Sequence, residues 1–276
     1  MMKRISIIVI LLFIYYNASS QSERMIDQIR AHNSGTAVWW AGHNSWIIRS
    51  GDLVVGTDLY LEDSPRIVPS PITPEELATV IDISFVTHAH GDHFNGPTSR
   101  VLLEKSNCIF VLPESCLQSA QKIGIPGSRI KVAKPREPFD IQGIHVNPLR
   151  AIHGDENFAI YIDANLQDCG YVMTIDGKTF LQPGDSYLLE DHLFLKHVDV
   201  LFFSPTEHNM YIDRSLILIN TLEPDYIFPQ HHSTIAVDES NRFWANGYPY
   251  EVRLRLTQAL KDRYYILKPG EMREIR

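Results

Sequence analysis

Cysteine is scarce in this sequence, with three residues in a chain of 276. Cys108, Cys116 and Cys169 are too few and too irregularly spaced for a disulfide framework. Two interpretations remain open: one bridge, between Cys108 and Cys116, or buried free thiols that act as small apolar residues.

Basic residues are in the minority, since 25 Lys and Arg stand against 33 Asp and Glu, a formal charge of −8. Nucleic acid is therefore not expected as a partner, because binding to phosphates requires a basic surface. Linkers, low-complexity tracts and charge blocks are missing as well. The sequence thus gives no reason to divide the chain into several domains.

No apolar run is long enough to span a membrane. The candidate, residues 5–16, has twelve residues, whereas a spanning helix needs roughly 20. Two basic residues precede it and 17-NASS-20 follows it, the layout of a secretory signal peptide. We expect cleavage after Ser20 and a periplasmic or secreted mature protein, of formal charge −10, that forms one domain over residues 21–276 without membrane association. An uncleaved anchor is the alternative, and the oligomeric state is left open.

Short apolar and β-branched runs, many bounded by Gly, Pro, Asn or Asp, predict a chain rich in strands. The predicted strands lie within 36–58 and at 83–86, 109–111, 144–149, 158–163, 170–175, 178–181, 200–203 and 226–228. The predicted helices are 73–80, which has a hydroxyl cap and a proline at its first position, and 114–122, 189–197, 214–222 and 251–261. This order favours an α+β fold of two sheets flanked by helices.

The segment 87-THAHGDHFNG-96 contains three histidines and an aspartate within six residues, directly after the apolar run 83-ISFV-86. Side chains at alternate positions of an extended chain point the same way. His88 and His90 can therefore present two imidazoles to one point just beyond the strand.

Gly91 permits a turn, after which Asp92 and His93 cannot share that direction. A second cation would suit them, because paired metals in hydrolases lie about 3.5–4 Å apart. Such a group of titratable side chains would be costly to bury unless something binds it.

Neither cation would be complete with two protein ligands, so further ligands are needed at the ends of other strands. Three residues meet this need, each in a turn after an apolar run: His153, Asp185 in 181-LQPGDS-186 and His231 in 226-YIFPQHH-232.

The ordered series of these residues resembles the metallo-β-lactamase superfamily, a broad group of binuclear metallohydrolases. The segment 39-WWAGHNSW-46 and the later Asp58 resemble its L-ascorbate-6-phosphate lactonase-like and N-acyl phosphatidylethanolamine phospholipase D-like branch. The usual proline after that aspartate is Leu59 here. The resemblance implies a four-layer αββα sandwich with two metals at one edge of the paired sheets.

The resemblance also implies a role for each residue. The first of two divalent cations would be held by His88, His90 and His153, and the second by Asp92, His93 and His231, with Asp185 bridging both. His232 is an alternative to His231, and Asp58 would orient a ligand histidine or the metal loop. Because all ligand atoms are nitrogen or oxygen, zinc is expected, with manganese or iron as alternatives.

Other histidines receive less specific interpretations. His43 and His208 would either contact a substrate or support their own loops. Exposed or satisfied core positions are expected for His32, His145, His192 and His197. The tryptophans at 39, 40, 46 and 244 are expected in the core.

Two divalent cations lower the pKa of a shared water and polarise the scissile bond, so no serine or cysteine nucleophile is required. We therefore expect an exported hydrolase in which a metal-bridging hydroxide attacks a small-molecule substrate, with Asp92 and Asp185 as catalytic residues and Asp92 helping to move a proton. The resemblance indicates a lactone, phosphoester or phosphodiester.

Three alternatives remain. One is β-lactam hydrolysis, which is less expected because many zinc β-lactamases resemble this chain elsewhere but carry Cys or Ser at the position of Asp185. The others are a di-iron redox protein with the same ligands and a non-catalytic metal-binding protein.

Overall fold

The computed structural model describes residues 23–62, 66–153, 166–239 and 247–276. The predicted signal peptide, the predicted strand at 158–163 and Trp244 lie outside these residues. Within the described part of the chain, no helix is both long and apolar enough to cross a lipid bilayer.

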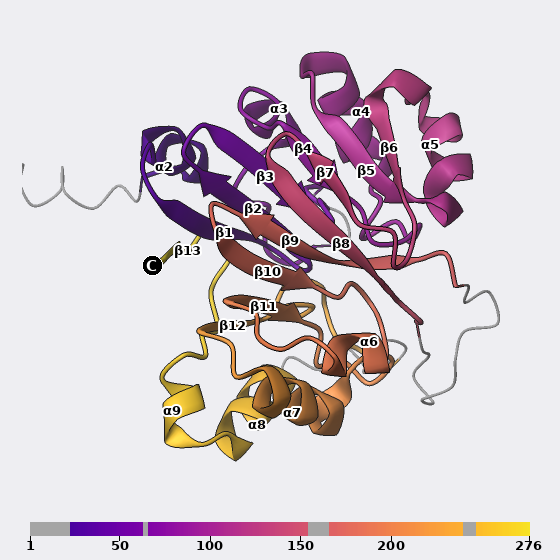
Figure 1. The fold of residues 1–276 in the computed structure, drawn as a ribbon. Coiled ribbons are helices and arrows are strands. Elements are labelled where there is room, and N and C mark those ends of the chain that lie inside the picture. Colours follow the sequence, from indigo (N-terminus) through magenta and orange to yellow (C-terminus); the bar gives the residue numbers. More distant parts are fainter. Residues whose placement is uncertain (1–22, 63–65, 154–165, 240–246) are drawn as a thin grey trace, which may run out of the picture.

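Two β-sheets face each other at the centre of the described residues (Figure 1). The first sheet has the order β13-β1-β2-β3-β4-β5-β6, with β1 Thr36–Gly42, β2 Ser45–Ser50, β3 Leu53–Thr57, β4 Ile83–Phe85, β5 Ile109–Pro113, β6 Ile130–Ala133 and β13 Met272–Ile275. The second has the order β12-β11-β10-β9-β8-β7, with β7 Phe139–Ile141, β8 Ile144–Arg150, β9 Cys169–Ile175, β10 Lys178–Gln182, β11 Val200–Phe203 and β12 Tyr226–Pro229.

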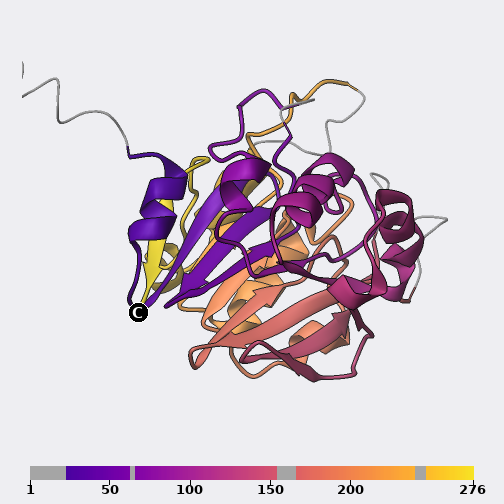
Figure 2. The same cartoon turned by 90° about the horizontal axis from the view of Figure 1, so that it is seen from above.

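Helices cover the outer face of each sheet (Figure 1). The first sheet is covered by α2 Met25–Ala31, α3 Pro74–Leu77, α4 Gly96–Lys105 and α5 Leu117–Ile123. The second is covered by α6 Glu190–Leu193, α7 Tyr211–Leu222, α8 Tyr248–Arg255 and α9 Gln258–Lys261. Seen from above in Figure 2, the indigo and purple strands of the first sheet lie over the orange strands of the second. The expected αββα sandwich is confirmed.

The alternation of residues along β1 shows how the layers are built. Val38 and Trp40 pack between the two sheets, while Ala37 and Trp39 pack against the helices on the other face. Successive side chains of a strand point to opposite faces, so a strand covered on both sides is apolar throughout. The expectation that tryptophans 39, 40 and 46 lie in the core is confirmed, since each is fully buried.

Several expectations are corrected. The helix predicted at 251–261 is two helices, α8 and α9, because the backbone of Leu256 and Thr257 is extended. Helices α2 and α4 and strands β6, β7 and β13 were not predicted. Of the two interpretations left open for the cysteines, the bridge between Cys108 and Cys116 is wrong and the buried free thiols are confirmed, since all three cysteines are free and buried. These two cysteines lie at opposite ends of the five-residue strand β5, which is roughly 17 Å long, whereas a disulfide needs Cα atoms within about 7 Å.

Strand direction brings the predicted site residues to one edge of the sandwich. Strands β3, β4, β5 and β6 run parallel, as do β10, β11 and β12. The predicted site residues follow the carboxyl ends of β3, β4, β8, β10, β11 and β12, and His43 lies in the turn between β1 and β2.

Candidate metal centre

The loop after β4 holds its own shape. The backbone N–H groups of His93 and Phe94 donate to the carbonyl of His90 at 3.0 and 2.7 Å, which closes a turn around Gly91. Asn95 then caps α4, since its side chain accepts a hydrogen bond from the backbone of the third helical residue at 2.9 Å. The four predicted ligands of this loop are thus held between a strand and a capped helix.

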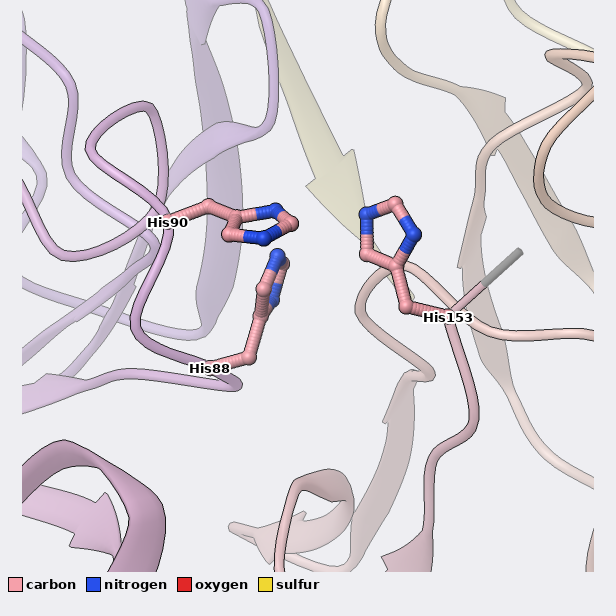
Figure 3. Close-up of side chains that lie close together, drawn as sticks. All are labelled: His88, His90 and His153. Carbon is pink, nitrogen blue, oxygen red and sulfur yellow. The ribbon is translucent and has the colours of Figure 1, made fainter. Parts of the chain in front are cut away.

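Three imidazoles form the first half of the site. Figure 3 shows His88 and His90, from the loop after β4, and His153, from the loop after β8, with their rings turned toward one another. Their ligand nitrogens all lie within 4.8 Å of one another. His88 and His153 are buried, whereas His90 is half-buried. The structure therefore brings together the three residues expected around one cation.

Asp185 lies between this group and the rest of the site. Its Oδ2 is 3.2 Å from Nε2 of His153 and 3.4 Å from Nε2 of His93. Its Oδ1 is 3.0 Å from Nε2 of His231. The two oxygens of one carboxylate thus face histidines of both predicted metal sets.

The second half of the site combines both sheets. Nε2 of His93 is 3.2 Å from Nε2 of His231 and 3.9 Å from Oδ2 of Asp92. Asp92 and His231 also group with His43, all three ligand atoms lying within 4.8 Å of one another. His43 therefore lies in the same cluster as Asp92 and His231.

Asp58 lies behind the histidines, fully buried. Its Oδ2 accepts a hydrogen bond from Nδ1 of His93 at 2.9 Å, and its two oxygens accept from the hydroxyl and the backbone of Thr87, both at 2.8 Å. The bond to Nδ1 leaves Nε2 of His93 free to face the site. Leu59, where the resemblance leads one to expect proline, does not disturb this contact. Thr87 is not among the predicted residues, because a hydroxyl after a strand is typical of any turn.

The two remaining histidines of this region have different surroundings. His208, in the loop after β11, has Nε2 3.6 Å from Oδ2 of Asp185, and its ring stacks on His153 at 5.3 Å. His232 points elsewhere: its ring stacks on Trp40 at 4.5 Å, and Nδ1 bonds to the hydroxyl of Ser233. The structure thus places His231 rather than His232 in the cluster.

The four histidines that were expected at exposed or core positions lie outside this cluster. His145 is exposed and pairs with Asp140, and His197 is exposed near Asp225. His32 is half-buried against Trp39. His192 is fully buried on α6, and its Nε2 has no hydrogen-bond partner.

The carboxylates of the site are held ionised. Burial alone would raise the pKa of Asp185, but His231 and His93 outweigh it and hold that pKa well below its usual value. Burial would likewise raise the pKa of Asp92, and His93 and His43 reverse the effect. Both aspartates are therefore anionic at neutral pH.

The histidines are mostly held neutral. Burial lowers the pKa of His88 well below its usual value, and nearby His93 lowers it further. His93 is the exception: burial would lower its pKa, but Asp185 and Asp58 raise it well above the usual value. A bound cation would replace this proton, because ligand histidines bind metals in the neutral form.

The contacts of the cluster fit a metal. Buried Nε2 of His88 has no hydrogen-bond partner, and two ring nitrogens, of His93 and His231, face each other at 3.2 Å. Two zinc-bound nitrogens lie about 3.3 Å apart, since each is about 2.0–2.1 Å from a tetrahedral ion. Imidazole nitrogens and carboxylate oxygens are also the donors that divalent first-row metals accept.

A cluster of buried histidines and aspartates at the edge of an αββα sandwich defines a class of metal-dependent hydrolases. The family model described as "Beta-lactamase superfamily domain" matches residues 37–231, and the chain belongs to this superfamily. It is an enzyme, a metal-dependent hydrolase of the metallo-β-lactamase fold.

Relatives and solved structures agree with this assignment. The chain is 25% identical over 234 residues to a UPF0173 metal-dependent hydrolase of Pyrococcus furiosus, covering 78% of this chain and 95% of the relative. It is 26% identical over 244 residues to one of Korarchaeum cryptofilum, covering 86% and 99%. The metallo hydrolase Igni18 of Ignicoccus hospitalis has a similar fold, with a TM-score of 0.67, 18% identity and coverage of 86% and 97%.

Proposed function

We propose that the chain is an exported, binuclear metallohydrolase. The observation that supports two cations is the position of Asp185, whose Oδ1 faces His231 at 3.0 Å while its Oδ2 faces His153 at 3.2 Å. A carboxylate placed in this way can serve one ion with each oxygen. His88, His90 and His153 would hold the first ion and Asp92, His93 and His231 the second.

The two carboxylates of the site would have different tasks. When bound, a pair of divalent cations supplies a water of lowered pKa and polarises the scissile bond. The side chain of Asp92 is 24% exposed, whereas that of Asp185 is 3% exposed. Asp92 can therefore reach a substrate; it would orient the attacking water and pass a proton toward the leaving group.

The protein's thiols do not compete for this role. Cys108 is buried beside β5, and burial raises its pKa to about 11. The thiols of Cys116 and Cys169 are also buried, and burial raises their pKa values. A neutral thiol is a poor nucleophile, so attack by an activated water is the better proposal.

For the substrate we propose a small molecule with a lactone, phosphoester or phosphodiester bond. The resemblance of the Gly42-His43 turn and Asp58 to the lactonase-like branch supports this class. A neighbour in fold, an isothiocyanate hydrolase from Delia radicum gut bacteria, has a TM-score of 0.63 and 18% identity. This similarity shows the fold alone and does not identify a substrate. Isothiocyanates are therefore only added to the set of compounds to be tested. Export rests on the signal-peptide layout of residues 1–20 and is tested by the mass of the mature chain.

The deciding experiment is elemental analysis of the mature protein. The wild type is expected to hold about two zinc or manganese ions per chain, and His90→Ala is expected to lose at least one. His145→Ala, which removes an exposed histidine of β8, is the matched control and keeps both ions. No bound metal after reconstitution would overturn the proposal.

Activity is then measured on lactone, ester, phosphodiester, β-lactam and isothiocyanate probes. Asp92→Ala is expected to lower turnover by a factor on the order of 10² to 10⁴, since it removes the group that moves the proton. Wild-type turnover in that variant would contradict its role. Two bound iron ions with a visible spectrum and no hydrolysis would instead indicate the di-iron alternative.

A further inference from the structure

The main-chain contacts of residue 43 account for the shape of its turn, but they do not explain why the residue is a histidine. His43 lies in the turn between β1 and β2 with a φ of 55°, a left-handed conformation that glycine and asparagine adopt more easily. Its N–H donates to the hydroxyl of Thr234 at 2.7 Å, and its carbonyl accepts from Nε1 of Trp40 and from the backbone of His231. Any residue other than proline can make these main-chain bonds, so the imidazole requires a separate explanation.

The imidazole contacts the rim of the metal centre. Nε2 of His43 lies 2.9 Å from Oδ2 of Asp92, and its ring lies 4.1 Å from the ring of His231. The side chain of His43 is 2% exposed, whereas that of Asp92 is 24% exposed. The rigid, buried imidazole of His43 thus contacts the carboxylate of Asp92, which is exposed enough to turn into solvent.

We infer that His43 is a positioning residue, which donates a hydrogen bond from Nε2 to Asp92 and so holds that carboxylate toward His93 and His231. The inference rests on the proposed metal centre. The oxygen of Asp92 that His43 holds, Oδ2, is also the one that lies 3.9 Å from Nε2 of His93. Through its carbonyl, His43 also fixes the backbone of His231, so it aligns ligands that come from the ends of both sheets.

The test is a zinc titration against a chromophoric chelator, which resolves two binding steps. His43→Leu keeps much of the side-chain volume but removes the donor. It is expected to weaken the binding of one ion by about 10- to 100-fold, as loss of an outer partner typically does, and to leave the other ion unchanged. His43→Gln places an amide N–H near the position of Nε2 and is expected to recover most of the affinity.

A double-mutant cycle shows whether His43 acts through Asp92. In an Asp92→Ala background, His43→Leu is expected to cause no further loss, because its partner is already gone. His43→Asn suits the left-handed backbone but is too short to reach Asp92, so it reports the same loss if His43→Leu does not fold. His145→Leu removes the histidine of an exposed pair with Asp140, also at 2.9 Å, and is expected to change neither step.

Three outcomes separate this inference from the proposed function. A wild type that binds no zinc contradicts the metal centre itself. A wild type that binds two ions, with His43→Leu weakening both equally and His43→Gln recovering neither, shows a merely structural histidine and overturns the inference. So does an undiminished effect of His43→Leu in the Asp92→Ala background.

Discussion

Asp58 accepts three hydrogen bonds, two from Thr87 and one from Nδ1 of His93. All three donors need an acceptor at this buried position. In Asp58→Asn, the amide would turn an N–H₂ group toward one of these donors. We expect a loss of about 1–3 kcal/mol in the free energy of unfolding, because a buried donor loses its acceptor. We also expect zinc affinity about 10- to 100-fold lower, because His93 loses the bond that fixes its ring.

Urea unfolding of the metal-free protein and zinc titration measure the two effects. Asp140→Asn is the matched control, since its carboxylate also pairs with a histidine but is 79% exposed. It is expected to change both quantities little, because exposed ion pairs contribute little. Wild-type zinc affinity in Asp58→Asn would show that the carboxylate does not orient His93.

At the scale of elements, the loops after β4 and β10 are in direct contact at Gly184. Its φ is 65°, and a Cβ there would lie 2.6 Å from Cβ of Thr87. Gly184→Ala therefore combines backbone strain with a clash between the loops that carry His88 and Asp185. We expect the free energy of unfolding to fall by about 2–4 kcal/mol and zinc binding to weaken, since the two ligand loops must separate.

Gly177→Ala is the control that measures the effect of backbone strain without a clash. Gly177 has a similar φ of 73°, but no atom lies within 4 Å of the position of its Cβ. We expect a loss of only about 1 kcal/mol and unchanged zinc binding. Thermal unfolding and zinc titration compare the variants, and equal effects of the two substitutions would refute the importance of the close approach.

The sequence predicted those helices and strands that have a local pattern of their own, such as an apolar run or a helix cap. The apolar run before residue 87 and the alternation of His88 and His90 indicated a strand end with two imidazoles side by side, and both lie as expected. Strand β13 was not predicted, because Met272–Ile275 is mostly exposed and is a strand only through its pairing with β1. Helix α4 did carry a signal, the cap at Asn95, but it follows a histidine-rich loop and lacks a strong apolar face.

The candidate site, like the helices and strands, was predicted where a local pattern indicated it. Residues within one loop could be grouped by spacing, whereas the sets of ligands drawn from several loops came from the resemblance. The bond between His43 and Asp92, which joins residues 49 positions apart, was not predicted. His231 was preferred over His232, and in the structure the ring of His232 stacks on Trp40 instead. Such contacts follow from the packing of the two sheets, which a single sequence does not specify.

At the scale of the whole molecule, the first half of the chain supplies the first sheet apart from β13, and the second half supplies β13 and the second sheet. Each half also supplies part of the site. Strands of the first sheet lead into His88, His90, Asp92 and His93, and strands of the second sheet lead into His153, Asp185 and His231. A cation bound between them therefore links the sheets, and metal binding should stabilise the folded state as a whole.

Acid should destabilise the metal-free molecule through buried histidines outside the cluster. Fully buried His192 accepts a hydrogen bond from the backbone of Leu189, and burial lowers the pKa of His192 to about 4. The unfolded chain binds this proton near pH 6.5. Because the folded pKa is the lower one, the stabilisation is complete above pH 6.5 and is lost as the pH falls toward 4.

This difference in pKa corresponds to about 3 kcal/mol at most, at 1.36 kcal/mol per pKa unit. His192→Gln can still accept the bond from Leu189 but does not titrate. In urea unfolding of the metal-free protein, the wild type should therefore lose stability more steeply than this variant between about pH 6.5 and 4. His145→Gln, at an exposed site on β8, is the control and should follow the wild type. Parallel curves for the wild type and His192→Gln would mean that His192 takes up its proton in the folded protein at an ordinary pH, and that water reaches this part of α6.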